Sequence, residues 1–119
     1  MLPFTNQAVL EGSVLKPVEY RVTATGRPVL FLELEHLSQH PDPDPSLRME
    51  VCMPVMVMGE LADQCRSLLP GMVLRVTGRL NQKRWVKEDK VRWGRHELVA
   101  IDVVILDSQE ENHPKVDCL

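Results

Sequence analysis

Two tryptophans set among basic residues form the most distinctive chemical pattern in this sequence. Trp85 and Trp93 lie eight residues apart, and the six basic residues between positions 83 and 95 face only two acidic ones. Indole rings offer flat faces on which unpaired bases stack, while cations neutralise the phosphates of a single strand. The segment is therefore a candidate single-strand-binding site, and its candidate contacts are Lys83, Arg84, Trp85, Lys87, Lys90, Arg92, Trp93 and Arg95.

A plainer interpretation of the same segment stays open. Both tryptophans would then anchor a loop on the protein body, and the charges would only solvate it. Five further arginines either extend the positive track or are ordinary surface charges: Arg21, Arg27, Arg48, Arg75 and Arg79. Of these, Arg48 is included among the candidate contacts. Tyr20 is either a third stacking platform or a packing residue.

The overall charge of the chain does not exclude a nucleic-acid partner. The formal net charge is −3, but local fields decide where an anion docks. The basic segment carries a local excess of positive charge, and the acidic residues gather after Asp102. That acidic end either competes with nucleic acid, contacts a basic partner or simply keeps the protein in solution.

Residues that would support catalysis or metal binding do not converge. The four histidines are scattered, and the three cysteines lack the paired spacing of a zinc site, which favours reduced thiols. Glu33 and Glu35 share a strand face, but Asp42 and Asp44 lie between prolines with no ordered scaffold. We therefore expect no metal, no cofactor and no enzymatic activity.

Hydrophobic alternation predicts a protein built mainly of strands. Leucines at every second position between Val29 and His36 are typical of a strand with one buried face. Gly12 indicates a bend in the first strand, and Pro54 is expected to end the third. The predicted strands are 6–16 with a resumption at 20–23 after Pro17, then 29–36, 47–53, 72–80 and 96–106.

Three other segments lack strand alternation. Apolar residues from Met58 to Leu69 follow helical spacing, and Pro70-Gly71 ends this one short helix. Prolines at every second position between 41 and 45 predict a stiff, exposed connection. The basic segment from Asn81 to Arg95 shows no period and is expected to be a long connection.

This order of elements predicts an all-β fold with one short helix, the five-stranded Greek-key barrel called the OB-fold. In that fold the helix lies between strands three and four, and the connection between strands four and five lies at the rim of the ligand-binding face. We expect one OB-fold domain over residues 1–107. Residues 108–119 are expected to be an acidic, mobile tail.

Several short stretches resemble the primosomal replication protein N (PriB) family of single-stranded-DNA-binding proteins. They are Asn6 with Leu10 and Gly12, the segment 26–28, the stretch 31–36 ending in Leu-Glu-His, the Met-Pro-Val segment at 53–57 with Gly59, and the strands 71–78 and 98–107. The resemblance implies a homodimer that binds single-stranded DNA. It also implies a role in replication restart within the primosome, with the primosomal helicase and the general single-strand-binding protein as partners.

One departure from that family concerns the stacking surface. The resemblance would place a Trp just before the Met-Pro-Val segment, where this chain has Arg48-Met49-Glu50-Val51. If the function is kept, the stacking surface has moved to Trp85 and Trp93. The alternative is an OB-fold protein-interaction module with little or no direct nucleic-acid binding.

The sequence also bears on location. The first twelve residues carry neither a basic lead nor an apolar stretch of signal-peptide length. No apolar run approaches the length that spans a bilayer. We therefore expect a cytoplasmic protein with no membrane association.

Overall fold

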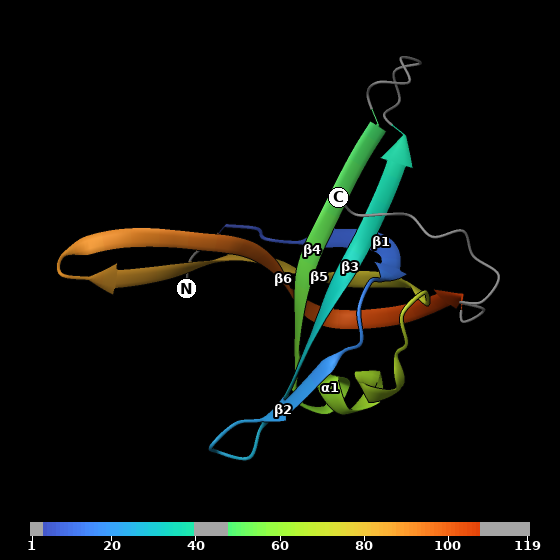
Figure 1. The fold of residues 1–119 in the computed structure, drawn as a ribbon, viewed down its shortest axis with the longest axis horizontal. Coiled ribbons are helices and arrows are strands. Elements are labelled where there is room, and N and C mark those ends of the chain that lie inside the picture. The colour runs from blue at the N-terminus through green and yellow to red at the C-terminus, as the bar shows by residue number, and fades with distance from the viewer. Residues whose placement is uncertain (1–3, 40–47, 108–119) are drawn as a thin grey trace.

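The computed structural model describes residues 4–39 and 48–107 of the chain (Figure 1). Strands dominate this part, and a single short helix with a following 3-10 turn interrupts them. In chain order the elements are β1 (Ala8–Val14), β2 (Glu19–Val22), β3 (Pro28–Gln39), β4 (Arg48–Met58), α1 (Glu60–Gln64), the 3-10 turn Cys65–Ser67, β5 (Val73–Lys87) and β6 (Lys90–Asp107).

The strands close into a barrel. Their order is β1-β5-β6-β4-β3-β2, and an additional pairing of β1 with β3 joins β1, β5, β6, β4 and β3 into a ring, with β2 attached outside it. All pairs are antiparallel except β4 with β6, which pair in parallel at Val55–Leu98 and Met56–Val99. A ring of five strands with a helix between β4 and β5 is the OB-fold, and that prediction is confirmed.

The barrel interior follows from the alternation in the strands. Leu30, Leu32 and Leu34 of β3 are buried, because every second residue of a strand points to the same face. Leu74 and Val76 of β5 join them. The helical segment covers one end of this core through Ala62, Cys65 and Leu68, which are also buried.

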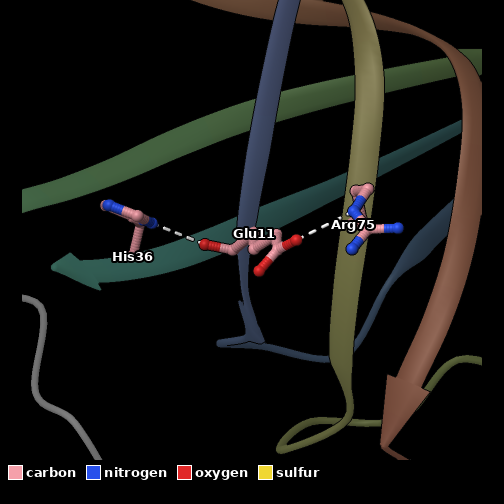
Figure 2. A network of polar contacts seen from close by, with 3 residues as sticks. All are labelled: Glu11, His36 and Arg75. Atoms are coloured by element: carbon pink, nitrogen blue, oxygen red, sulfur yellow. Dashed lines mark hydrogen bonds and ion pairs between the residues drawn. The ribbon is translucent and has the colours of Figure 1, made fainter.

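The ring closes where β3 crosses β1 at Gly12. A Cβ at this position would lie 2.3 Å from the carbonyl oxygen of Glu35, so only glycine permits so close a crossing. Next to it, Glu11 contacts both neighbouring strands (Figure 2): its carboxylate accepts a 2.8 Å bond from Arg75 on β5, and its carbonyl oxygen lies 2.6 Å from Nδ1 of His36 on β3. These contacts hold β1 between β5 and β3.

Two ribbons extend beyond the barrel in different directions, one formed by β3 and β4 and the other by β5 and β6 (Figure 1). The second overturns our expectation of a loop at 81–95, because β5 and β6 stay paired up to Lys87 and Lys90. The chain reverses at Glu88 and Asp89, whose φ angles of 53° and 64° are those of a two-residue hairpin turn. We call residues 81–97 the β5–β6 hairpin.

Two other expected boundaries are wrong. Pro54 does not end a strand, since β4 continues through it to Met58. Proline is tolerated where a strand edge is open, and the pairing of β4 with β6 begins only at Val55. The α-helix is also shorter than predicted and ends at Gln64, with the remaining turn in 3-10 geometry.

The cysteines differ from our expectation of reduced thiols at one position. Cys52 is disulfide-bonded, whereas Cys65 is a free, buried thiol whose pKa is raised by burial. The proline-rich connection at 41–45 and the acidic tail at 108–119 lie outside the described residues, so the boundary at residue 107 stays a prediction.

Candidate nucleic-acid interface

The β5–β6 hairpin has two faces, which the strand register defines. Trp85 pairs with Arg92 and Lys87 with Lys90, whereas Arg84 pairs with Trp93 and Val86 with Val91. Partners across an antiparallel ladder share a face, and successive pairs alternate between faces. The cationic face therefore carries Lys83, Trp85, Lys87, Lys90 and Arg92, and the valine face carries Arg84, Val86, Val91 and Trp93.

The cationic face combines an accessible indole with available charge. Trp85 is 55% exposed, so its ring is not sealed in the interior. Within residues 4–39 and 48–107, none of the four cations around it forms an ion pair. Cations without a carboxylate partner can neutralise phosphates without first breaking a bond. The face thus offers both elements that single-strand binding requires.

A groove on the outer surface of the barrel continues this face. It is lined by one set of residues near the hairpin and another near β3, and both sets share Pro54, Lys83, Arg95 and Glu97. The part near the hairpin also includes Trp85, and the part near β3 also includes Phe31 and Lys16. A strand that stacks on Trp85 can therefore continue over the barrel. The full lining is Lys16, Pro17, Glu19, Phe31, Leu32, Glu33, Pro54, Val55, Lys83, Trp85, Arg95, His96 and Glu97.

Phe31 provides a second aromatic surface in the groove. It pairs with Met56 across β3 and β4, and the guanidinium of Arg21 lies 5.7 Å from its ring centre. Phe31 was not among the predicted contacts, because the family resemblance placed the stacking aromatic before Pro54, on the neighbouring strand. The available signal was its alternation with the buried leucines of β3, which directs Phe31 outward.

Charges along the groove are mixed. Arg95 donates a 3.3 Å bond to Glu33, so among the hairpin cations it is the one engaged by a carboxylate within the described residues. Glu97 is buried and accepts a 2.9 Å bond from Asn81. The groove thus contains both positive and negative groups, whereas the positive charge is concentrated on the cationic face of the hairpin.

The groove is open to solvent rather than an enclosed pocket. Its two parts have volumes of about 250 and 190 Å³. Among the described residues, no group of three or more His, Cys, Asp and Glu side chains is placed to hold a metal ion. An open surface of this kind suits an extended ligand.

The structure does not bring all the predicted contacts together. Trp93, 61% exposed, lies with Arg84 on the valine face, opposite Trp85. Arg48 begins β4 on the other ribbon and pairs with Glu50 at 3.0 Å. Lys83, Trp85, Lys87, Lys90 and Arg92 form one continuous surface, and Arg95 borders it at the groove. The remaining three belong to other surfaces.

Fold and site define a single-strand-binding type of OB-fold protein. The profile of a family described as "another single-strand binding protein family" matches residues 6–91, which is more than half of the chain. The chain therefore belongs to this family of single-strand binding proteins. The narrower resemblance to the PriB family stays a prediction. A search of curated protein sequences found no match.

Solved structures share the fold at low sequence identity. The SSB of Plasmodium falciparum in complex with ssDNA has a TM-score of 0.74 and 18% identity, covering 90% of this chain and 99% of its own. The small single-stranded DNA-binding protein of Streptomyces coelicolor has a TM-score of 0.64 and 18% identity, covering 92% of this chain and 100% of its own. These likenesses establish the fold.

No helix within the described ranges is both long enough and apolar enough to cross a membrane.

Proposed function

We propose that this protein binds single-stranded DNA without altering it chemically. In this proposal a base stacks on Trp85 while its neighbouring phosphates contact Lys83, Lys87, Lys90 and Arg92. The strand then continues into the groove beside Phe31. The observation that carries the proposal is the exposed indole of Trp85 among four cations that have no ion-pair partner in the described structure.

The two tryptophans provide a matched test of this proposal. A stacked aromatic is worth roughly 1–3 kcal/mol per base, or about 5- to 150-fold in affinity. We expect Trp85→Ala to weaken binding of labelled oligo-dT within that range, measured by fluorescence anisotropy at low salt. Trp93→Ala removes the same ring from the opposite face and is expected to have a smaller effect. No binding by the wild type at low salt would refute the proposal.

A finer role is also proposed. The PriB-like stretches support an accessory function in the primosome during replication restart, with the primosomal helicase and the general single-strand-binding protein as partners, in the cytoplasm. A co-sedimentation assay with purified helicase, with and without single-stranded DNA, tests the partnership. Failure of the two proteins to associate in either condition would remove the primosomal role but leave single-strand binding intact.

We further propose that the protein is a homodimer. In addition to the resemblance of the chain to the PriB family, the edge of β1 supports this assembly. The ladder between β1 and β3 includes only Ser13 and Val14, and Val9 on β1 is 55% exposed. An unpaired strand edge is a ready site for pairing with another chain. Sedimentation at micromolar concentration should give twice the 13.6 kDa mass of one chain. A species with the mass of one chain would refute the dimer.

The second candidate function is a protein-interaction module. The valine face favours it, because Val86, Val91 and Trp93 are 60%, 47% and 61% exposed. Apolar side chains gathered on one surface often mark a protein contact. Under this alternative, oligo-dT would not bind at low salt, and Trp93→Ala rather than Trp85→Ala would weaken association with the helicase.

A further inference from the structure

Trp85 rests on a glycine of the opposite strand. A Cβ built on Gly94 would lie 2.5 Å from both Cη2 and Cζ3 of Trp85, the outer atoms of the indole, and 3.5 Å from Cβ of Lys83. Real Cβ atoms do not approach other atoms as closely as 2.5 Å. The outer edge of the ring therefore occupies the space that any other residue at position 94 would fill.

Gly94 differs from the glycines that the fold itself requires. At Gly12 and Gly78 an added Cβ would meet the backbone, 2.3 Å from the Glu35 oxygen and 2.2 Å from the Val99 oxygen. At Gly94 the nearest atoms belong to a side chain that is able to rotate. The φ angle of Gly94 is also outside the left-handed region, so the backbone does not require glycine there. The space for the indole is the one need that the structure displays at this position.

We infer that Gly94 is a positioning residue for Trp85. With no side chain at 94, the indole packs its outer edge against β6 and stays on the cationic face, where over half of its surface remains exposed. A cross-strand aromatic that covers a glycine is a known stabilising pair in sheets, where it helps to fix the strand register. A ring held in place loses less conformational entropy when a base stacks on it. The inference rests on the proposed single-strand binding.

The register makes this arrangement specific to one tryptophan. Between Gln82 and Arg84 on β5 the ladder shifts by one residue, because β6 contributes the three steps from Trp93 to His96 against two on β5. This irregularity contains Gly94 and Arg95. Because Gly94 directly follows Trp93 on β6 and lies two residues from Arg92, the partner of Trp85, it lies on the face of Trp85 and opposite Trp93. Trp93 has no comparable glycine contact in the described structure.

The test combines Gly94→Ala with a change of the ring. In a Trp93→Phe background, where Trp85 is the sole tryptophan, Gly94→Ala is expected to keep the fold by circular dichroism. It should raise the quenching of Trp85 emission by acrylamide and weaken oligo-dT binding roughly threefold to tenfold. A phenyl ring lacks Cη2 and Cζ3. In a Trp85→Phe background Gly94→Ala should therefore leave affinity unchanged, whether or not Gly94→Ala lowers stability beside Trp85.

The outcomes separate the inference from the proposed function. If Gly94→Ala changes neither the quenching nor the affinity of a chain that keeps Trp85, the inference is overturned while single-strand binding stands. The same loss of affinity in the Trp85→Phe background would also overturn it, because a general effect on the hairpin would then be at work. A wild type that does not bind oligo-dT overturns the proposed function, and the role assigned to Gly94 with it.

Discussion

Tyr20 joins the outer strand β2 to the helix. Its hydroxyl donates a 2.6 Å bond to Asp63, and the guanidinium carbon of Arg66 lies 4.2 Å from its ring centre. The hydrogen bond to Asp63 is the main cause that raises the pKa of Tyr20, with desolvation and the negative charge of Asp63 adding to it. Arg66 acts in the opposite direction.

Titration of Tyr20 should reveal this contact, because the chain contains one tyrosine. We expect phenolate absorbance to appear with a midpoint above the ordinary value of about 10. Asp63→Ala should lower the midpoint and Arg66→Gln should raise it. A raised pKa means that the folded state binds the proton more tightly, so this contribution to stability is present below about pH 10 and is lost as pH rises through the folded-state pKa. Identical midpoints in all three proteins would contradict the assignment.

Glycines at strand crossings carry a second prediction at the residue scale. Gly78→Ala places a methyl group against the Val99 carbonyl, and overpacking of this kind costs about 1–3 kcal/mol or more. We expect the midpoint of urea unfolding to fall accordingly. Gly94→Ala is the matched control, because its Cβ meets a movable side chain rather than backbone. Equal unfolding midpoints for the two variants would show that the β5–β6 crossing relaxes easily.

At the scale of elements, the β5–β6 hairpin projects away from the barrel and is held by its own ladder and turn. Glu88 and Asp89 both adopt positive φ, which costs most non-glycine residues about 1–2 kcal/mol. Asparagine followed by glycine is the preferred pair in this turn. The natural turn therefore holds the hairpin less firmly than an optimal sequence would.

Replacing the turn should stiffen the hairpin. We expect Glu88→Asn with Asp89→Gly to slow amide hydrogen exchange in residues 83–93 while leaving exchange in the barrel unchanged. The same change removes two acids beside Lys87 and Lys90, so binding of oligo-dT at low salt should tighten. Glu88→Gln with Asp89→Asn removes the charges without supplying a glycine, and separates the two effects. Faster exchange in the Asn-Gly variant would contradict the turn assignment.

At the scale of the whole molecule, an anion of net charge −3 presents one strongly positive surface. Bound phosphates release counterions, so log K falls with log salt by about 0.7 for each phosphate neutralised on a single strand. If the four cations of the cationic face each neutralise one phosphate, the slope should be about −2.8. The protein would then lose affinity steeply as salt rises despite its acidic composition.

Neighbouring cations on opposite faces allow this prediction to be checked. Lys83→Gln should reduce the slope by about 0.7, whereas Arg84→Gln, on the valine face, should change it much less. Anisotropy titrations of oligo-dT across a series of salt concentrations measure both slopes. Equal slopes for the two variants would mean that DNA does not distinguish the faces of the hairpin.

Much of the barrel could be predicted from sequence because its strands each bury one face. The leucines at every second position of β3 all enter the core while the residues between them face outward, and the helical spacing from Leu61 to Leu68 differs clearly from that pattern. The β5–β6 hairpin was mistaken for a loop because this signal is absent there. Both of its faces meet solvent, so residues 83–93 show no alternation of apolar and polar side chains.

The sequence by itself determined that Trp85, Trp93 and a cluster of cations share one short segment, since this is a matter of composition. Only the tertiary structure decided which tryptophan faces those cations. A one-residue change of register moves a side chain to the other face of a ribbon, and the register that puts Trp85 with Arg92 and Trp93 with Arg84 is set by pairing between β5 and β6. The structure likewise brings Lys16, Phe31 and Pro54 to the groove, because their proximity comes from barrel closure.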